Sequence, residues 1–374
     1  MTFSRTAALQ RLSRLAPLLC LIALVVAGCS PSHYAQTALR PISDFGRIGD
    51  DIQTTTLKWA VVVFVLVEGA LVYAIFRFRG KPGDPEPVQL HGNTTVEIIW
   101  TIIPALILAA IAVPTVRGIF QTNTIPTDNA LEVRVIGHQW WWEFRYPTLN
   151  VTTANELHIP VGQTVSLRME TGDVVHSFWN PRFAGKRDVF PNRETRLWFK
   201  AEEAGEYPGQ CAEFCGIQHG RMAFRVVAQP AEEFKAWSAH MQTLKAQPPA
   251  PPPPPPAEKK PAQGPGKKAE QGPPTPPEAV AAAPTAGEKL FLSKGCVGCH
   301  SLNAFDAPKG MIGPNLANVG ARTYIGAGTL KNTDENLARW IQNPQLIKQG
   351  VLMPNLGVSP EDAKSLVAYL RAHQ

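Results

Sequence analysis

The sequence predicts a multidomain membrane protein with a two-helix transmembrane hairpin, an all-β domain and an all-α domain. Two apolar runs of about 20 residues near the N-terminus are each long enough to cross a bilayer as a helix. Short runs of alternating polar and apolar residues follow and predict β-strands. A proline-rich segment then separates the β region from a last part that contains the pattern Cys-x-x-Cys-His.

Length and composition support this division. A chain of 374 residues is too long for one ordinary domain. Of its 35 prolines, 15 fall between positions 248 and 284, and such a stretch cannot bury a core, so it predicts a linker. The predicted parts are a signal peptide (1–28), an N-terminal extracytoplasmic segment (29–56), the helical hairpin (57–118), the β domain (119–240), the linker (241–284) and the α domain (285–374).

The N-terminus has the pattern of an export signal. Basic residues precede an apolar run at 15–27, and Val26-Ala27-Gly28-Cys29 resembles a bacterial lipobox. In that pattern Cys29 is lipidated and becomes the mature N-terminus. Ordinary cleavage, or retention of the run as an anchor, is the alternative.

The two expected membrane spans are 57–76 and 96–116. Arg77, Arg79 and Lys81 directly follow the first span, which places the short loop in the cytoplasm by the positive-inside rule. Both ends of the mature chain then face outward. We therefore expect a two-pass protein of the bacterial cytoplasmic membrane, in contact with lipid, with the β and α domains on the periplasmic side.

Two carboxylates interrupt these apolar segments. Glu68 lies in the middle of the first span, where a charge is costly enough to imply a side chain that is protonated or faces protein. The pattern assigns it no role. Glu97 lies at the cytoplasmic mouth of the second span, where it is either a solvated acid at a helix end or a functional group.

The β domain is expected to be a sandwich or barrel of antiparallel strands. Alternating runs bounded by Gly, Pro and Asn carry this prediction. They lie at 131–135, 156–159, 164–167, 196–199 and 222–228.

One segment of the β domain has the composition of a metal site. Two thiolates, two imidazoles and a thioether are available from Cys211, Cys215, His176, His219 and Met222. Sulfur ligands combined with imidazole select copper, and a weak Met ligand is typical of electron-transfer copper.

The spacing indicates two copper ions rather than one. A mononuclear blue-copper centre uses a single Cys, whereas two thiolates can bridge two ions that each bind one His. Met222 and the backbone carbonyl of Glu213 then remain as weak ligands. A disulfide, a zinc site or unrelated residues are the competing interpretations.

Residues 40–230 resemble subunit II of the haem-copper cytochrome c oxidases, whose dinuclear CuA centre lies on a Cys-x-Glu-x-Cys-x3-His-x2-Met loop. Three further segments match that family: Gly137-His-Gln-Trp140-Trp-Trp142, Val96-Glu97-x-x-Trp100-Thr-x-x-Pro104 and Lys186-Arg-Asp188. The resemblance implies a cupredoxin-like fold for the β domain.

The resemblance also implies roles for single residues. Cys211 and Cys215 would bridge the coppers, with His176 and His219 as terminal ligands and Met222 and the Glu213 carbonyl as weak ones. The Glu213 carboxylate would reach a magnesium ion shared with subunit I. Trp140 would be the surface point that receives electrons from cytochrome c, and Glu97 would load protons for subunit I. His138 and His158 are expected to be structural.

The all-α part contains Cys296-Val-Gly-Cys299-His300, the attachment signature of haem c. His300 supplies the proximal nitrogen, and Met311 and Met353 are the methionines available for the other side of the iron. The segment resembles a class I cytochrome c, with Met353-Pro354 before a last helix at 360–373. That resemblance makes Met353 the axial ligand.

Together these features predict the electron-receiving subunit II of a caa-type, proton-pumping cytochrome c oxidase. The external electron donor would be a cytochrome c or an upstream complex. Electrons would pass through the fused haem c and CuA to subunit I, which reduces dioxygen. Subunit III is a further expected partner. The alternative is a CuA protein that serves another system, such as a nitrous oxide reductase, but the nine histidines are scattered singly. The basic residues that give a net charge of +6 are also scattered, which excludes nucleic-acid binding.

Overall fold

The computed structural model describes residues 20, 34–80, 82–86, 88–89, 92–126, 128–244, 285–304 and 312–372. The predicted signal peptide except residue 20, the lipidation site Cys29, most of the linker and Met311 lie outside the described residues.

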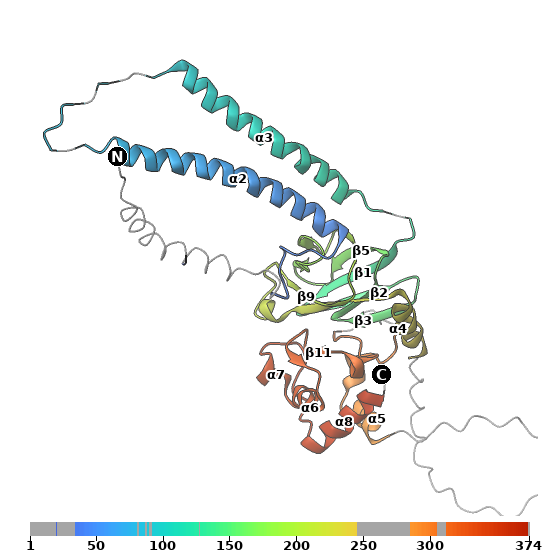
Figure 1. The fold of residues 1–374 in the computed structure, drawn as a ribbon. Helices are drawn as coiled ribbons and strands as arrows, with labels where there is room; N and C mark the ends of the chain where they lie inside the picture. Colours follow the sequence, from blue (N-terminus) through green and yellow to red (C-terminus); the bar gives the residue numbers. More distant parts are fainter. Residues whose placement is uncertain are drawn as a thin grey trace, which may run out of the picture.

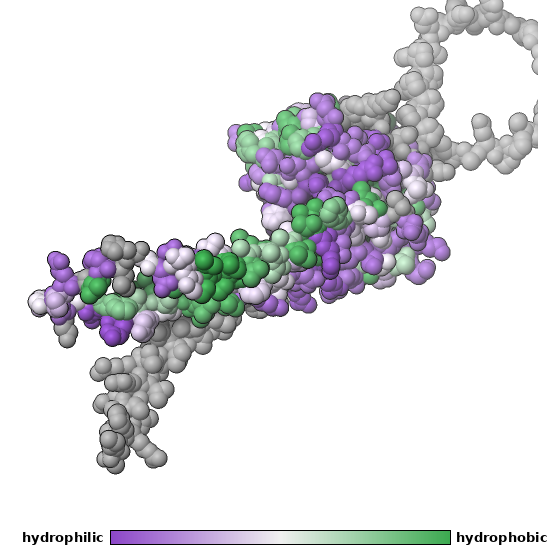
Figure 2. All heavy atoms as spheres, turned by 90° about the horizontal axis from the view of Figure 1, so that it is seen from above, coloured by the Kyte–Doolittle hydropathy of each residue, from purple (hydrophilic) through white to green (hydrophobic). Residues whose placement is uncertain are grey.

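Two long helices form the N-terminal hairpin (Figure 1). They are α2 (Asp44–Arg77) and α3 (Thr94–Asn123), and both are long and apolar enough to span a membrane. The side chains of Ser43 and Asn93 cap their N-termini by accepting backbone N–H groups. Figure 2 shows the apolar band on the hairpin against the mostly hydrophilic surface of the rest.

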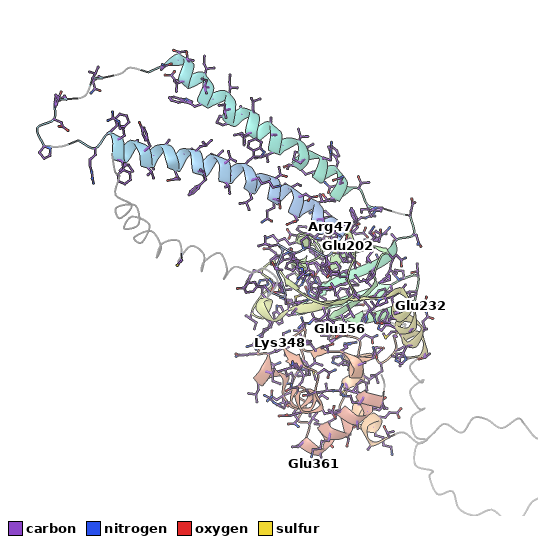
Figure 3. The ribbon with its side chains drawn as sticks, viewed as in Figure 1. Arg47, Glu156, Glu202, Glu232, Lys348 and Glu361 are labelled. Atoms are coloured by element: carbon purple, nitrogen blue, oxygen red, sulfur yellow. The ribbon has the colours of Figure 1, made fainter. Side chains whose placement is uncertain are left out.

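Both helices extend beyond the expected spans on the side of the β domain. The first turns of α2 are polar and contact the β domain, where the Asp44 carboxylate accepts the backbone N–H of Lys200 at 2.8 Å. Arg47 forms an ion pair with Glu202 at the same junction (Figure 3). The helical pattern therefore continues past the bilayer to attach the hairpin to the β domain.

The β domain is a sandwich of two five-stranded sheets. The strand orders are β3-β2-β1-β5-β8 and β4-β10-β9-β6-β7. The strands are β1 (Leu131–His138), β2 (Trp141–Tyr146), β3 (Val151–Ala154), β4 (Glu156–Pro160), β5 (Thr164–Thr171), β6 (His176–Trp179), β7 (Arg187–Val189), β8 (Thr195–Lys200), β9 (Gly205–Cys211) and β10 (Ala223–Gln229).

The prediction of an all-antiparallel sandwich was wrong for two strand pairs. β1 pairs with β5 and β4 pairs with β10 in parallel, whereas the other neighbours are antiparallel. Alternation in the sequence reports which face of a strand is buried, and it carries no information about the direction of the neighbouring strand.

Aromatic rings fill the space between the two sheets. Trp142, Phe144, Phe178 and Phe224 are completely or almost completely buried, and Phe178 stacks on Phe224 with ring centroids 4.3 Å apart. Gly209 leaves room for this pair, because a Cβ at that position would lie 2.3 Å from the ring of Phe224. The resulting rigid core supports the end of β9, where Cys211 lies.

A helix that the sequence analysis did not identify follows the last strand. Helix α4 (Ala231–Thr243) begins with acidic Glu232 and Glu233, which favour a helix N-terminus. Its Trp237 stacks on His158 at 4.2 Å, and this contact attaches the helix to the sandwich.

The C-terminal domain consists of short helices around its own core. Its elements are α5 (Ala286–Ser293), η3 (Cys296–Gly298), η4 (Val319–Ala321), β11 (Tyr324–Ile325), β12 (Leu330–Lys331), α6 (Asp334–Gln342), α7 (Pro344–Ile347) and α8 (Pro360–Ala372). Helices α5 and α8 cross closely at Gly287, where a Cβ would lie 2.4 Å from the carbonyl oxygen of Ser365. This domain lies on the side of the sandwich opposite the helical hairpin (Figure 1).

Candidate metal centre and haem pocket

Strand pairing brings the predicted metal ligands together. In the register of β6 with β9, Phe178 lies opposite Cys211, so His176 at the start of β6 lies close to the end of β9. The loop after Cys211 then folds back, because the backbone N–H of Cys211 donates to the carbonyl of Met222 at 3.0 Å. Residues 35 positions apart in the sequence, His176 and Cys211, thus share one site.

Sulfur and nitrogen atoms converge inside this loop. The Sγ atoms of Cys211 and Cys215 are 3.8 Å apart, and the Sγ of Cys211 lies 3.9 Å from Nδ1 of His176. The Sγ of Cys215 lies 3.7 Å from Nδ1 of His219 and 3.8 Å from Sδ of Met222. The carbonyl of Glu213 is 3.3 Å from the Sγ of Cys211. All six predicted donors are therefore in one place.

The donor set fits a copper centre better than the competing interpretations. Two sulfurs 3.8 Å apart are not in a disulfide, in which the bond is about 2.0 Å. His176, Cys211 and Cys215 are buried, and their ligand atoms lie within 4.8 Å of one another. A buried group of thiols, imidazoles and a thioether suits copper.

A second layer of contacts orients His176. Its Nε2 lies 2.8 Å from Oδ1 of Asp173, so Nδ1 is left to face the cysteine sulfurs. Burial alone would raise the pKa of Asp173, but hydrogen bonds from His176 and from the backbone of Gln139 and Val174 outweigh it and lower that pKa. The carboxylate therefore remains charged and holds the ring. No motif in the sequence marks Asp173.

The two thiols do not ionise alike. A hydrogen bond from Cys215 is the largest influence that lowers the pKa of Cys211, and the same pairing raises the pKa of Cys215. Of the two thiols, Cys211 is therefore the one that ionises more readily.

Trp140 contacts the metal-binding loop at Cys215. Its indole Nε1 donates to the carbonyl of Cys215 at 2.9 Å, and Nε2 of Gln139 donates to the same oxygen at 2.8 Å. The expected surface position differs from the structure, where Trp140 is only 8 % exposed. The reason is that the C-terminal domain covers it, which no pattern near Trp140 indicates.

Neighbouring aromatic residues divide between two environments. Trp142 belongs to the sandwich core, whereas Trp141 packs with Ala154 and with Ala327 of the C-terminal domain. His138 stacks on Trp141 at 4.2 Å and pairs with Glu143 at 2.9 Å, which agrees with a structural role.

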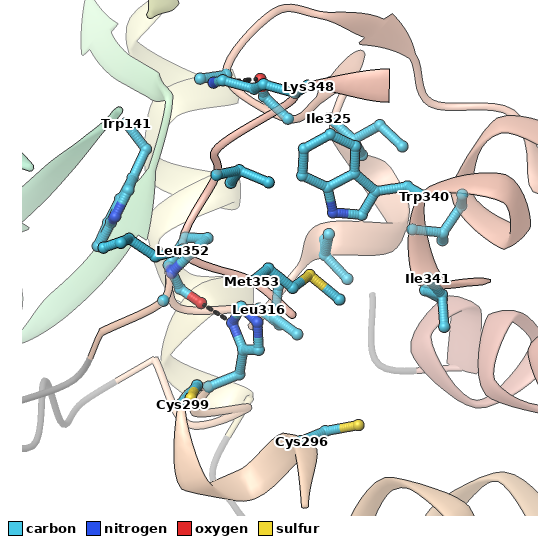
Figure 4. A pocket seen from close by; sticks show the side chains of 18 of the residues that line it. Trp141, Cys296, Cys299, Leu316, Ile325, Trp340, Ile341, Lys348, Leu352 and Met353 are labelled. Atoms are coloured by element: carbon cyan, nitrogen blue, oxygen red, sulfur yellow. Dashed lines mark hydrogen bonds between the residues drawn. The ribbon is translucent and has the colours of Figure 1, made fainter. Parts of the chain in front are cut away.

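A cavity between the C-terminal domain and the sandwich is lined by the Cys-x-x-Cys-His residues and by Trp140 and Trp141. Cys296, Cys299, His300 and Met353 all line it. Figure 4 shows Trp141 on one side of the cavity and Trp340 on the other, with Met353 between them. Its walls are mostly apolar, as a porphyrin requires.

The residues around His300 fit a haem. Its Nδ1 donates to the carbonyl of Pro314 at 2.8 Å, so Nε2 is free to bind iron. Burial lowers the pKa of His300, which keeps the ring neutral as a ligand must be. Gly313 permits close approach, because a Cβ there would lie 2.5 Å from the imidazole.

Two cations near the haem cavity were not predicted. Arg322 is buried and lines the cavity, and its Nε has no hydrogen-bond partner among the described residues. Lys348 is 1 % exposed and lies between the two domains. Contacts between distant segments bury both side chains, so no local sequence motif marks them.

Three carboxylates that the sequence singled out are exposed. Glu213 is exposed on the metal-binding loop, where its backbone carbonyl faces the site, and Glu97 is exposed in the first turn of α3. Glu68 is exposed on α2.

Comparison with known protein families gives three matches. Residues 47–117 match the transmembrane domain of cytochrome c oxidase subunit II, and residues 147–229 match its periplasmic domain. Residues 284–374 match cytochrome c.

Individual proteins match over most of the chain. Cytochrome c oxidase subunit 2 of Alkalihalophilus pseudofirmus is 37% identical over 325 residues, which are 84% of this chain and 84% of that protein. The Bacillus subtilis protein of the same name is 31% identical and covers 96% of this chain and 97% of its own length. A crystal structure of the periplasmic domain of oxidase subunit II from Bradyrhizobium japonicum is 28% identical, with a TM-score of 0.31, and covers 32% of this chain and 98% of that one.

Proposed function

The chain belongs to the family of cytochrome c oxidase subunit II, and from this premise we propose how its two redox sites work together. With its fused cytochrome c domain it is the subunit through which electrons reach the oxidase. Its cofactors are CuA copper and haem c, and it is a membrane protein with two spans.

For the copper centre we assign six ligands. Cys211 and Cys215 would hold two coppers through their thiolates, His176 and His219 would each provide an imidazole, and Met222 and the carbonyl of Glu213 would be the weak ligands. The convergence of these donors, of which His176, Cys211, Cys215 and Met222 are buried, supports this assignment. Copper supplies a one-electron carrier whose charge is shared between two ions, and the rigid sandwich keeps its ligands in place in both oxidation states.

For haem c we assign Cys296 and Cys299 to the thioether bonds and His300 and Met353 to the iron. The free Nε2 of His300 and the position of Met353 across the same cavity support this assignment. A thioether ligand raises the reduction potential, which suits a donor to copper.

The order of transfer is haem c, then CuA, then subunit I. One observation carries this order: Trp140 lines the haem cavity and also donates its indole N–H to Cys215 in the copper loop. The side chain therefore bridges the two sites through one ring and one hydrogen bond. As the sequence predicted, Trp140 receives electrons in this proposal. Their immediate donor is the haem domain of the same chain.

Other parts of the proposal concern the assembled oxidase. The Glu213 carboxylate, exposed beside the copper ligands, is assigned to a magnesium ion shared with subunit I, and Glu97 is assigned to proton uptake. Subunit III is a further partner, and the folded domains lie on the periplasmic side of the inner membrane. We also propose the domain boundaries that the sequence predicted: the hairpin at 57–118, the copper domain at 119–240 and the haem domain at 285–374.

Rapid mixing of the oxidase with a reduced cytochrome c tests the order. The visible haem c band should change first and the near-infrared copper band second. In Trp140→Leu the first step should keep its rate, and the second should slow about tenfold or more, because the hydrogen-bonded ring is lost. Copper reduction that precedes haem reduction would reject the order and favour another electron path.

A further inference from the structure

A buried lysine of the haem domain contacts the copper domain. Lys348 follows α7, and its side chain lies at the boundary of the two domains (Figure 3). Its Nζ donates to the carbonyl of Trp140 at 3.0 Å, of Arg221 at 2.7 Å and of Gly326 at 3.1 Å. Two of these acceptors belong to the copper domain: Arg221 lies in the copper-binding loop itself, and Trp140 contacts that loop through its hydrogen bond to Cys215.

The number of donors matches the number of acceptors. An ammonium group has three N–H bonds, and three carbonyls receive them. Burial lowers the pKa of Lys348 to about 7, so the charged form depends on these carbonyls. If the domains separated, the haem domain would keep one acceptor and water would replace the other two.

Further contacts surround the lysine. The guanidinium of Arg221 donates to the carbonyl of Ile347 at 2.5 Å, and the backbone N–H of Ala223 donates to the carbonyl of Ala327 at 3.1 Å. At the edge of the interface, Thr323 donates its hydroxyl to Glu206 at 2.9 Å. The contacts involve backbone atoms on both sides, so they define one arrangement of the domains rather than a loose encounter.

Lys348 also lies beside the proposed electron path. It lines the haem cavity together with Trp140 and Trp141. The carbonyl that it contacts belongs to Trp140, whose indole binds the carbonyl of Cys215. The ammonium group therefore holds the residue that bridges the two centres.

We propose that Lys348 is a positioning residue that locks the haem domain onto the copper domain, so that electrons cross from one fixed arrangement. This inference rests on the proposed order of transfer. In each event the haem iron is oxidised by one electron and the copper centre is reduced by one, and no bond is made or broken. A core lysine that served the haem domain alone would find its acceptors within that domain, whereas two of the three lie outside it.

Amine labelling of the intact oxidase tests the position of Lys348 without a mutation. With a water-soluble acylating reagent and peptide mass analysis, Lys348 should label at least about tenfold more slowly than Lys364, an exposed lysine of α8. A low pKa leaves more of the reactive neutral amine, so only burial can explain slow labelling. Equal labelling of the two lysines would overturn the proposal.

A second experiment measures electron transfer in Lys348→Met, with Lys364→Met as the matched control. Loss of the charged hydrogen bonds should slow haem-to-copper transfer about tenfold and make its rate depend on solvent viscosity. The haem and copper absorption bands and the rate of haem reduction by an external donor should stay unchanged. These readouts separate an unlocked domain from a misfolded one.

The outcomes separate this inference from the proposed function. If the wild-type haem is reduced but never passes electrons to copper, the order of transfer fails. If the wild type transfers rapidly and Lys348→Met does so equally, with no effect of viscosity, only the positioning role fails. If Lys348→Met does not fold, the labelling result alone decides.

Discussion

At the scale of single residues, Cys215 connects the metal site to the rest of the protein. Its sulfur faces Cys211, His219 and Met222, while its carbonyl accepts hydrogen bonds from Gln139 and Trp140. The two hydrogen bonds to its backbone carbonyl do not depend on the identity of the side chain at position 215.

Cys215→Ser should therefore leave the fold intact and abolish the dinuclear centre, because one thiolate cannot bridge two coppers in the same way. Electron paramagnetic resonance should lose the hyperfine pattern of an electron shared by two coppers, and the haem c bands should persist. A shared pattern in the serine variant would contradict the assignment of Cys215 as a bridge.

Met353 is a test of the haem ligands. Met353→Ala should remove the weak near-infrared band of a thioether bound to haem iron and lower the reduction potential, as measured by redox titration. Met311→Ala is the matched control and should change neither. The reverse result would assign the iron to Met311.

Glu143 is a buried carboxylate whose charge depends on its neighbours. It is 5 % exposed, and although burial raises its pKa, hydrogen bonds from His138 and Arg145 outweigh that effect and lower it. A carboxyl group with a lowered folded-state pKa stabilises the protein above its unfolded pKa of about 4.3. That contribution is lost as the pH falls through the folded-state pKa.

Glu143→Gln should lower the free energy of unfolding near neutral pH by about 1–3 kcal/mol and weaken the loss of stability in acid. Denaturant unfolding at several pH values measures both effects. Glu170→Gln is the control, because Glu170 is exposed and lies 3.9 Å from Arg134, so its loss should cost little. An unchanged acid profile in Glu143→Gln would show that other groups control it.

At the scale of elements, the pairing of β9 with β10 depends on Gly209. Adding a methyl group there would bring it within 2.3 Å of Phe224, whose ring stacks on Phe178. Gly209→Ala should cost about 1–3 kcal/mol, because the ring must move within a packed core.

The same substitution should weaken copper retention, since Cys211 ends β9 two residues later. Thermal unfolding and metal analysis after dialysis measure the two effects. Gly185→Ala is the control, because a Cβ at Gly185 meets no atom within 4 Å. Equal stability of the two variants would mean that the sandwich adapts at Gly209.

The sequence predicted elements where one strong pattern decides them. The apolar runs located the two helices, and the spacing of Cys211, Cys215, His219 and Met222 grouped residues that the structure places in one loop. His176 joined them as the second imidazole available in the same domain, and the family resemblance then implied that it is a ligand. Strand direction in two pairs and helix α4 were missed, because both depend on packing between distant segments rather than on local pattern.

At the scale of the whole molecule, the redox sites and Glu97 lie at opposite ends. Glu97 is in the first turn of α3, the end of the hairpin far from the sandwich (Figure 1). The proposed sites of electron transfer and of proton uptake therefore lie in separate parts of the chain.

Glu97→Gln should slow turnover of the assembled oxidase several-fold, while the rate of haem-to-copper transfer measured by rapid mixing stays the same. Glu86→Gln is a control in the loop before α3. Unchanged oxygen consumption in Glu97→Gln would return this residue to the role of a solvated acid at a helix end.

The arrangement of the domains could not be predicted from the sequence. A proline-rich linker is long enough to connect the two domains in many relative positions, so it does not define their arrangement. Burial of Trp140 and Lys348 depends on the meeting of two surfaces that are about 200 residues apart in the chain. Several contacts between these surfaces join a side chain of one domain to a backbone carbonyl of the other, and no periodic pattern in the sequence marks such contacts.

The two carbonyls of the copper domain that bind Lys348 have a consequence for sequence variation among relatives. The carbonyls of residues 140 and 221 are main-chain atoms, and every amino acid carries such a carbonyl. Replacements at these positions leave the acceptors in place, so position 348 has no partner side chain with which to co-vary among relatives. What must be kept is the backbone conformation of the copper loop. Chimaeras that combine haem and copper domains from different relatives should therefore transfer electrons wherever that conformation is kept.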